Sequence, residues 1–262
     1  MADKILLPEE RSLKVLQASV VDFPETLVIL GSGWNRVLDN AKIETQIGYD
    51  QLFGAKTSVP GHLGRLIIAK IKNKRIAFMA GRFHMYEGYN GYEVTKPIRV
   101  FAQAGLKNLI LTAASGALNE NYRVGDFVIL SDLISLFLTL DNPLVGPQFI
   151  DVSQVFDKDL RKKAIEIANK LKLPIQEGIY VYNHGPSFET PADKRTLKIL
   201  GADVVGMSVV PETLVARSLN IKVLGLAFVT NLAFVKHDHL EVLAEAEKSG
   251  EKMQKFLTNL LT

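Results

Sequence analysis

The sequence contains no cysteine, which excludes disulfide bonds, thiolate nucleophiles and cysteine-ligated metal sites. It also lacks a long hydrophobic run: the most apolar stretch, residues 127–140, is too short to span a bilayer and contains Asp132. The first residues have no long apolar core, so we expect no signal peptide. These absences favour a cytoplasmic protein with no membrane partner.

The chain also has almost no excess of charge of either sign. The 31 Lys and Arg residues exceed the 28 Asp and Glu residues by three, in a chain of 262 residues. So small an excess gives little support for a nucleic-acid partner and is compatible with an anionic small-molecule substrate. Apolar residues make up 47% of the chain and charged residues 23%, which are ordinary values for a globular protein and exclude general disorder.

Short apolar runs of strand length recur along the chain, and several are rich in Ile and Val. These runs are 27–30, 66–71, 75–80, 108–112, 127–130, 178–181 and 223–229. Helical patterns lie between or after some of them, over 159–173, 191–201, 211–219 and 240–261. The alternation predicts an α/β fold: a single domain over residues 1–262, with a central mixed twisted sheet flanked by helices.

A glycine turn, Gly31-Ser32-Gly33, directly follows the first predicted strand. Glycines let the backbone turn sharply and approach a ligand, and the backbone N–H groups with the Ser32 hydroxyl can hold an anion such as phosphate. An ordinary turn is the alternative. The pattern is not a dinucleotide-binding motif, because Arg36 occupies the place of its last glycine.

A second cluster follows the strand 75–80. Strand-like alternation would point Arg82, His84 and Tyr86 to one side and their neighbours to the other. An arginine with a histidine suits an oxyanion, because the first offers a forked charge and the second a hydrogen bond. The alternative is an exposed edge segment whose charges are solvated.

Further polar residues stand at predicted turns. Glu189 precedes a predicted helix, where the helix dipole alone favours a carboxylate, and Ser208 is either a helix cap or a second anion contact. Asn231 ends the last strand and can present both a donor and an acceptor to a ligand, or simply form a turn. The group 237–239 invites a metal interpretation, but no acidic or cysteine cluster accompanies it, so we expect no metal.

Each motif is short, yet the set in this order closely resembles the trimeric purine nucleoside phosphorylases over nearly the whole chain. The segments that carry the resemblance are 31–33, 59–62, 81–89, 185–190, 206–208 and 230–231. It implies an enzyme of purine salvage that cleaves the N-glycosidic bond of purine nucleosides with inorganic phosphate, giving the free base and ribose 1-phosphate. It also implies a homotrimer, and a reaction with no cofactor beyond phosphate as co-substrate.

The resemblance assigns roles to twelve residues of this sequence. Phosphate would contact Ser32, Arg82, His84, the backbone of Ala114 and the hydroxyl of Ser208. The nucleoside would contact Tyr86, Phe188, Glu189, Met207, Asn231, His239 and, from a neighbouring subunit, Phe149. Asn231, Glu189 and His84 are the expected catalytic residues: Glu189 would accept from N1–H of the base, and Asn231 would contact O6 and N7.

This pairing favours 6-oxopurines such as inosine and guanosine. A carboxylate at Glu189 requires an N1–H, which adenine lacks at neutral pH, and unpaired polar groups make such discrimination large. Phosphorylases of methylthioadenosine, the nearest alternative, usually have Asp where this chain has Asn231. The residues at 182–184 depart from the family pattern and would widen base acceptance toward xanthosine or change sugar tolerance.

Two further alternatives belong to other functional classes. A non-catalytic nucleoside-binding protein would be expected to lose the phosphate site, yet Ser32, Arg82, His84 and Ser208 are all present. A dinucleotide-binding oxidoreductase is disfavoured by the broken glycine pattern. The segment 113–117 also departs from the family pattern, and the loops 133–149 and 231–239 are shorter than usual.

Overall fold

The structure is a computed structural model that describes residues 6–138, 141–147, 149–234 and 239–262, with backbone alone for Phe137 and 239–243. Its strands are β1 (Thr26–Leu30), β2 (Lys42–Gly48), β3 (Arg65–Ile71), β4 (Lys74–Ala80), β5 (Asn108–Ala117), β6 (Phe127–Ile134), β7 (Ile175–Tyr182), β8 (Val204–Gly206) and β9 (Lys222–Leu232). All of them belong to one mixed sheet, in the order β2-β3-β4-β1-β5-β8-β7-β6-β9. The predicted α/β fold with a central mixed sheet is therefore confirmed.

The sheet closes on itself at one end. β9 pairs in parallel with β5 and antiparallel with β6, so β5, β8, β7, β6 and β9 form a ring, while β1, β4, β3 and β2 extend from β5 as an open sheet. Since β4, β1, β5 and β9 run parallel to one another, their carboxyl ends meet at the same edge. Open α/β sheets bind ligands at such an edge.

Alternating side chains of the strands build a core on each face of the sheet. In β1, Leu27 and Ile29 join the larger apolar cluster, whereas Val28 and Leu30 join the cluster on the other face. This is the two-residue period of a strand buried on both sides, and it explains the continuous apolar run in the sequence.

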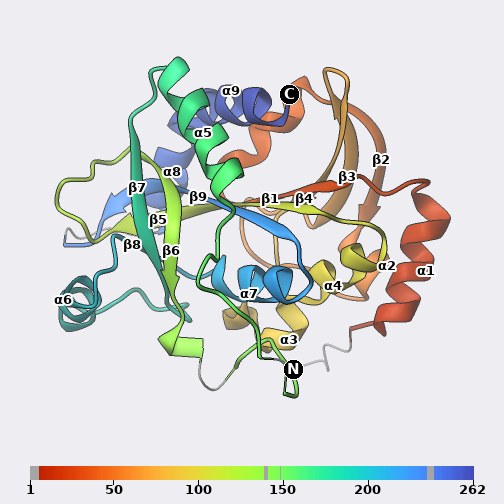
Figure 1. Ribbon diagram of the computed structural model, residues 1–262, viewed down its shortest axis with the longest axis horizontal. Coiled ribbons are helices and arrows are strands. Elements are labelled where there is room, and N and C mark those ends of the chain that lie inside the picture. Colours follow the sequence, from red (N-terminus) through yellow and green to blue (C-terminus); the bar gives the residue numbers. More distant parts are fainter. Residues whose placement is uncertain (1–5, 139–140, 148, 235–238) are drawn as a thin grey trace.

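Helices cover both faces (Figure 1). They are α1 (Glu9–Ser19), α2 (Tyr49–Phe53), α3 (Gly91–Val94), α4 (Lys96–Gln103), α5 (Lys158–Lys170), α6 (Pro191–Ile199), α7 (Val210–Ser218), α8 (His239–Lys248) and α9 (Gly250–Leu261), with 3-10 turns η1 (Trp34–Asn40), η2 (Met85–Glu87) and η3 (Leu136–Leu138). In Figure 1, α5 and α9 lie above the sheet, and α4 and α7 lie below it.

Two helix starts follow from local sequence. The side chain of Asp157 accepts hydrogen bonds from the backbone of Asp159 and Leu160 and so begins α5. Thr190 and Asp193 form a reciprocal capping box that begins α6, with a proline at its first position. This capping box fixes the backbone that presents the preceding residue, Glu189.

The prediction of one helix over 240–261 is wrong. The chain forms α8 and α9, separated at Ser249, because α8 packs against β9 whereas α9 packs against η1 and α5. The predicted helix 159–173 ends earlier, at Lys170. Strands β5, β6 and β7 are longer than predicted, and the sequence reading did not find β2, β8, α1 or α4.

Candidate active site

One open pocket lies where the carboxyl ends of β1, β4 and β9 meet the middle of β5 and the turn after β8. Its volume, with the solvent at its open mouth included, is about 730 Å³. It is lined by Gly31, Ser32, His62, Arg82, His84, Tyr86, Thr112, Ala113, Ala114, Ser115, Gly116, Phe188, Glu189, Val205, Gly206, Met207, Ser208, Thr230 and Asn231.

The glycine turn after β1 is locked against β5. The backbone N–H of Gly31 donates to the hydroxyl of Thr112 at 2.9 Å, and that hydroxyl donates to the carbonyl of Ile29 at 2.9 Å. A Cβ on Gly31 would lie 2.6 Å from the carbonyl oxygen of Thr112, so only glycine fits this approach. The turn therefore presents Ser32 to the pocket on a fixed backbone.

Arg82 is held from behind by two acceptors. One guanidinium nitrogen donates to Oε1 of Glu212 at 3.0 Å, and the other donates to the carbonyl oxygen of Thr112. The side chains of Arg82 and Glu212 are 3% and 6% exposed. The backbone N–H of Arg82 also donates to Nδ1 of His62 at 3.3 Å, which ties this arginine to the loop before β3.

The predicted alternation after β4 is confirmed. Arg82, His84 and Tyr86 line the pocket, whereas Phe83 and Met85 are buried in the core. The rings of His84 and Tyr86 stack with their centroids 4.7 Å apart.

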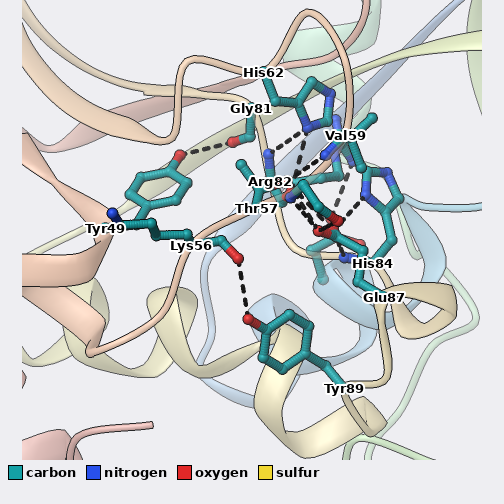
Figure 2. A network of polar contacts seen from close by, with 12 residues as sticks. Tyr49, Lys56, Thr57, Val59, His62, Gly81, Arg82, His84, Glu87 and Tyr89 are labelled. Carbon is teal, nitrogen blue, oxygen red and sulfur yellow. Dashed lines mark hydrogen bonds and ion pairs between the residues drawn. The ribbon is translucent and has the colours of Figure 1, made fainter. Parts of the chain in front are cut away.

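Glu87 links His84 to the loop that precedes β3 (Figure 2). Its carboxylate accepts from the backbone of His84 at 2.9 Å, and from the backbone and hydroxyl of Ser58 at 2.6 and 2.9 Å. Nδ1 of His84 lies 3.3 Å from the same carboxylate. A carboxylate only accepts, so Nδ1 carries the proton, and Nε2 of the neutral ring is left as an acceptor.

Burial controls the charge of both histidines. It lowers the pKa of His84, against the hydrogen bond with Glu87, and it lowers the pKa of His62 to about 3. For Glu87, burial acts to raise the pKa, but hydrogen bonds from His84 and Ser58 prevail and lower it to about 2. At neutral pH both rings are therefore neutral and Glu87 is ionised.

Ser208 lies in a strained turn between β8 and α7. Val209 has φ 70° and ψ −53°, and Val210 donates its N–H to the carbonyl of Ser208 at 2.7 Å, which together define a γ-turn. The backbone N–H of Ser208 meets the buried hydroxyl of Tyr180 at 3.3 Å. Ser208 is not a side-chain cap of α7, so of its two predicted roles, an anion contact near the helix N-terminus remains.

Glu189 is oriented by a neighbour that the sequence reading did not select as a site residue. Nδ2 of Asn183 donates to Oε1 of Glu189 at 2.7 Å and lies 3.4 Å from the carbonyl of Ser187. Phe188, 40% exposed, lies beside them at the wall of the pocket.

A β-bulge places two consecutive residues of β9 at the pocket. The register between β5 and β9 shifts after Ser115, so that Gly116 pairs with Asn231 and Thr230 is the extra residue. The hydroxyl of Thr230 donates to Oδ1 of Asn231 at 2.9 Å, which orients the amide. In a regular strand these two side chains would point to opposite faces.

Ten of the twelve predicted site residues line this one pocket. They are Ser32, Arg82, His84, Tyr86, Ala114, Phe188, Glu189, Met207, Ser208 and Asn231. Phe149 is outside it and is 96% exposed. His239 begins α8, but its side chain lies outside the described residues, as do residues 237 and 238.

The described part of the chain has neither a metal cluster nor a membrane-spanning helix. Within it, no group of three or more His, Cys, Asp or Glu side chains is placed to hold a metal ion. The helices described there are also too short or too polar to cross a membrane. The cytoplasmic location stays a prediction.

Comparison with known proteins gives a consistent result. The phosphorylase superfamily profile matches residues 25–262. Purine nucleoside phosphorylase 1 of Bacillus subtilis (strain 168) is 37% identical over 95% of this chain and 95% of its own. The chain belongs to the purine nucleoside phosphorylases.

Solved structures agree with this assignment. A Schistosoma purine nucleoside phosphorylase in complex with hypoxanthine has a TM-score of 0.89 and 36% identity, covering 96% of this chain and 95% of that one. The Schistosoma mansoni enzyme in complex with inosine has a TM-score of 0.89 and 37% identity, covering 96% and 94%. As a purine nucleoside phosphorylase, the chain belongs to a family of pentosyltransferases.

Several residues in or beside the pocket were not predicted as site residues from the sequence. His62 belongs to the segment 59–62 that carries the resemblance, but no role follows for it from the sequence; it lines the pocket, and its ring stacks on that of His84 with the centroids 5.3 Å apart. Thr112 and Thr230 lie within apolar strands, where polarity in an otherwise buried run is the signal that could have found them. Glu212 and Asn183 act through partners that only the fold reveals.

Proposed function

We propose that this chain catalyses the phosphorolysis of 6-oxopurine nucleosides, inosine and guanosine among them, to the free base and ribose 1-phosphate. The observation that carries the proposal is that a single pocket holds both a set of anion contacts and a carboxylate–amide pair suited to the base. Arg82 belongs to the first set, and Glu189 and Asn231 form the pair. Inorganic phosphate is the co-substrate, and the reaction needs no further cofactor.

The phosphate contacts combine a cation with neutral donors and acceptors. Arg82 supplies a forked charge, the hydroxyls of Ser32 and Ser208 and the backbone of Ala114 supply hydrogen bonds, and Nε2 of His84 accepts from a P–OH group. Such fixed groups bind phosphate beside the ribose and orient an oxygen for attack.

The base contacts stabilise the leaving group. A phosphate oxygen forms a bond to C1′ as the C1′–N9 bond breaks, and the sugar carries positive charge in an oxocarbenium-like transition state. The bonding pair goes to the purine, where an amide hydrogen bond from Asn231 to N7 stabilises the developing negative charge. Glu189 fixes the base by accepting from N1–H. Tyr86 and Met207 line the ribose, and the resemblance assigns its 5′-hydroxyl to His239.

We further infer a homotrimer in which Phe149 reaches a neighbouring subunit's site. Phe149 is 96% exposed, and Leu136 and Val145, close to it in sequence, are 60% and 58% exposed, so this part of the chain presents apolar side chains that a subunit contact would bury. Sedimentation equilibrium tests the assembly. Phe149→Ser should raise KM for the nucleoside without changing KM for phosphate, and a monomeric wild type with full activity would contradict this inference.

The deciding experiment for the proposed function measures base release from inosine, guanosine, xanthosine, adenosine and methylthioadenosine, with and without inorganic phosphate. We expect rapid, phosphate-dependent release from inosine and guanosine, with the two 6-amino nucleosides nearly inert. Release that needs no phosphate, or no release from any nucleoside, would reject phosphorolysis. Preference for xanthosine or methylthioadenosine would reassign the base and keep the reaction.

A further inference from the structure

Glu212 is a buried carboxylate with no role in the reaction as described so far. It lies in the first turn of α7, four residues after Ser208, and its partner Arg82 is 130 residues away in sequence. Both side chains of this ion pair are almost fully buried, at 3% and 6% exposure. Every other Lys or Arg ion pair among the described residues has a side chain at least 24% exposed.

Stability alone does not account for such a pair. Burying two charges costs several kcal/mol of desolvation each, and well-packed apolar residues of similar size are often at least as stable. The pair also forms at the wall of the pocket, since Arg82 is one of its lining residues. A costly pair in this place points to a function in ligand binding.

Glu212 and the carbonyl of Thr112 together fix the plane of the Arg82 guanidinium. They accept from two different nitrogens of the guanidinium. A planar fork held at two points cannot rotate, so its remaining N–H groups keep one direction. A single acceptor would leave the group free to turn about that one hydrogen bond.

Glu212 also offsets the charge of this part of the pocket. Arg82 carries one positive charge, Glu212 one negative charge, and His62 and His84 are neutral because burial lowers the pKa of each. Glu87, ionised at neutral pH, adds a second negative charge close to His84. These five side chains therefore carry no net positive charge, and an anion is held there by directed hydrogen bonds and the N-terminus of α7.

We propose that Glu212 is a positioning residue that aims the Arg82 fork at phosphate and limits how tightly the pocket holds that anion. This inference rests on the proposed function, because it takes phosphate as the ligand of Arg82. The inference depends on two properties of Glu212: the position of its carboxylate oxygen and its negative charge. Two substitutions separate these properties.

Glu212→Gln keeps an acceptor in place and removes the charge. Inorganic phosphate should then bind about tenfold more tightly, because a nearby negative charge is gone. Glu212→Asp keeps the charge and withdraws the carboxylate by one methylene, which frees the fork. Phosphate should then bind about tenfold more weakly. The two variants thus move the dissociation constant in opposite directions.

The measurement is calorimetric titration of the full chain with inorganic phosphate, without nucleoside, followed by steady-state kinetics. We expect KM for phosphate to fall in Glu212→Gln without a rise in kcat. Glu9→Gln is the matched control: it alters the Arg99–Glu9 ion pair, the next least exposed, which is outside the pocket. The Glu9→Gln variant should change the unfolding temperature and leave the dissociation constant for phosphate unchanged.

If a variant is unstable, its unfolding temperature measured with and without phosphate still tests the proposal. Because Arg82 loses its buried counter-charge in Glu212→Gln, phosphate should raise the unfolding temperature of that variant more than that of the wild type. Unchanged or weaker phosphate binding by Glu212→Gln, or unchanged or tighter binding by Glu212→Asp, overturns the proposal. A wild type that binds no phosphate would instead reject the proposed function.

Discussion

Nδ2 of Asn183 donates a hydrogen bond to Oε1 of Glu189 at 2.7 Å, so the carboxylate assigned to the base is held by a side chain six residues before it. Removing this bond in Asn183→Ala should lower kcat/KM for inosine about tenfold, because a hydrogen bond to a charged group contributes about 1.5–3 kcal/mol and part of it is replaced by water. KM for phosphate should stay unchanged.

Asn119→Ala is the control for that variant. Nδ2 of Asn119 donates to Oδ1 of Asp203 at 2.7 Å, the same kind of contact at the same length, and neither residue lines the pocket. Equal losses of kcat/KM in the two variants would mean that the Asn183 contact acts through stability alone.

A second prediction concerns Asn231 and the leaving base. Asn231→Ala should lower kcat for inosine about 100-fold or more, as the loss of one donor to a developing anion does in other enzymes, while the fold survives. Circular dichroism and the unfolding temperature check the fold, and steady-state kinetics check the rate. A normal rate, or an unfolded variant, would contradict the role.

Asn231→Asp tests the choice of base at the same position. A carboxylate accepts from a 6-amino group and repels a 6-oxo group, so the ratio of kcat/KM for adenosine to that for inosine should rise. Thr230 keeps a hydroxyl beside the new side chain, since it already donates to Oδ1 of Asn231. An unchanged ratio would mean that Asn231 does not face position 6 of the purine.

The fold class was predictable from the sequence because strands buried on both faces read as short apolar runs. β2 was not predicted because most of its residues are exposed, and β8 was not predicted because it has only three residues. The break between α8 and α9 was missed, although residues 247–252, which include Ser249 and Gly250, carry no apolar side chain and so interrupt the apolar pattern. Gly250 packs there against the side chain of Arg36, a contact between distant parts of the chain.

The residues of the site likewise fall into those that a local motif predicts and those that only the tertiary structure reveals. Residues placed by a local motif, such as Arg82 and His84 after β4, were identifiable from sequence and do line the pocket. The residues that hold such side chains in place were not identifiable from the sequence. Glu212 reaches Arg82 across 130 positions, and Thr230 reaches the pocket only because a β-bulge shifts the register of β9. Both depend on tertiary geometry, which no local pattern encodes.

A fourth prediction concerns the close approach of β1 and β5. In Gly31→Ala, the new Cβ would lie 2.6 Å from the carbonyl oxygen of Thr112, which also accepts from Arg82. The strands must separate, so we expect a loss of about 1–3 kcal/mol in the free energy of unfolding and weaker phosphate binding. Denaturant titration and calorimetry measure the two effects.

Gly105→Ala separates strain from the site effect. Gly105 has a φ of 101° with nothing within 4 Å of an added Cβ, and it does not line the pocket. The variant should lose stability through backbone strain and bind phosphate like the wild type. If Gly31→Ala did the same, the turn after β1 would have no part in holding the anion.

The last prediction follows from the buried neutral ring of His62. Burial lowers its pKa from 6.5 to about 3, so between these values the unfolded chain binds a proton that the folded chain does not. This contribution to stability is complete above about pH 6.5 and is lost progressively as the pH falls toward 3.

From pH 7 to pH 5, without phosphate, the free energy of unfolding of the wild type should fall by about 1–2 kcal/mol more than that of His62→Asn. Below about pH 4.5 the ionised Glu87, whose pKa is lowered to about 2, adds a further loss in both proteins. Urea denaturation at pH 7 and pH 5 measures the difference, and equal losses in the two proteins would show that His62 binds a proton in the folded chain as readily as in the unfolded chain.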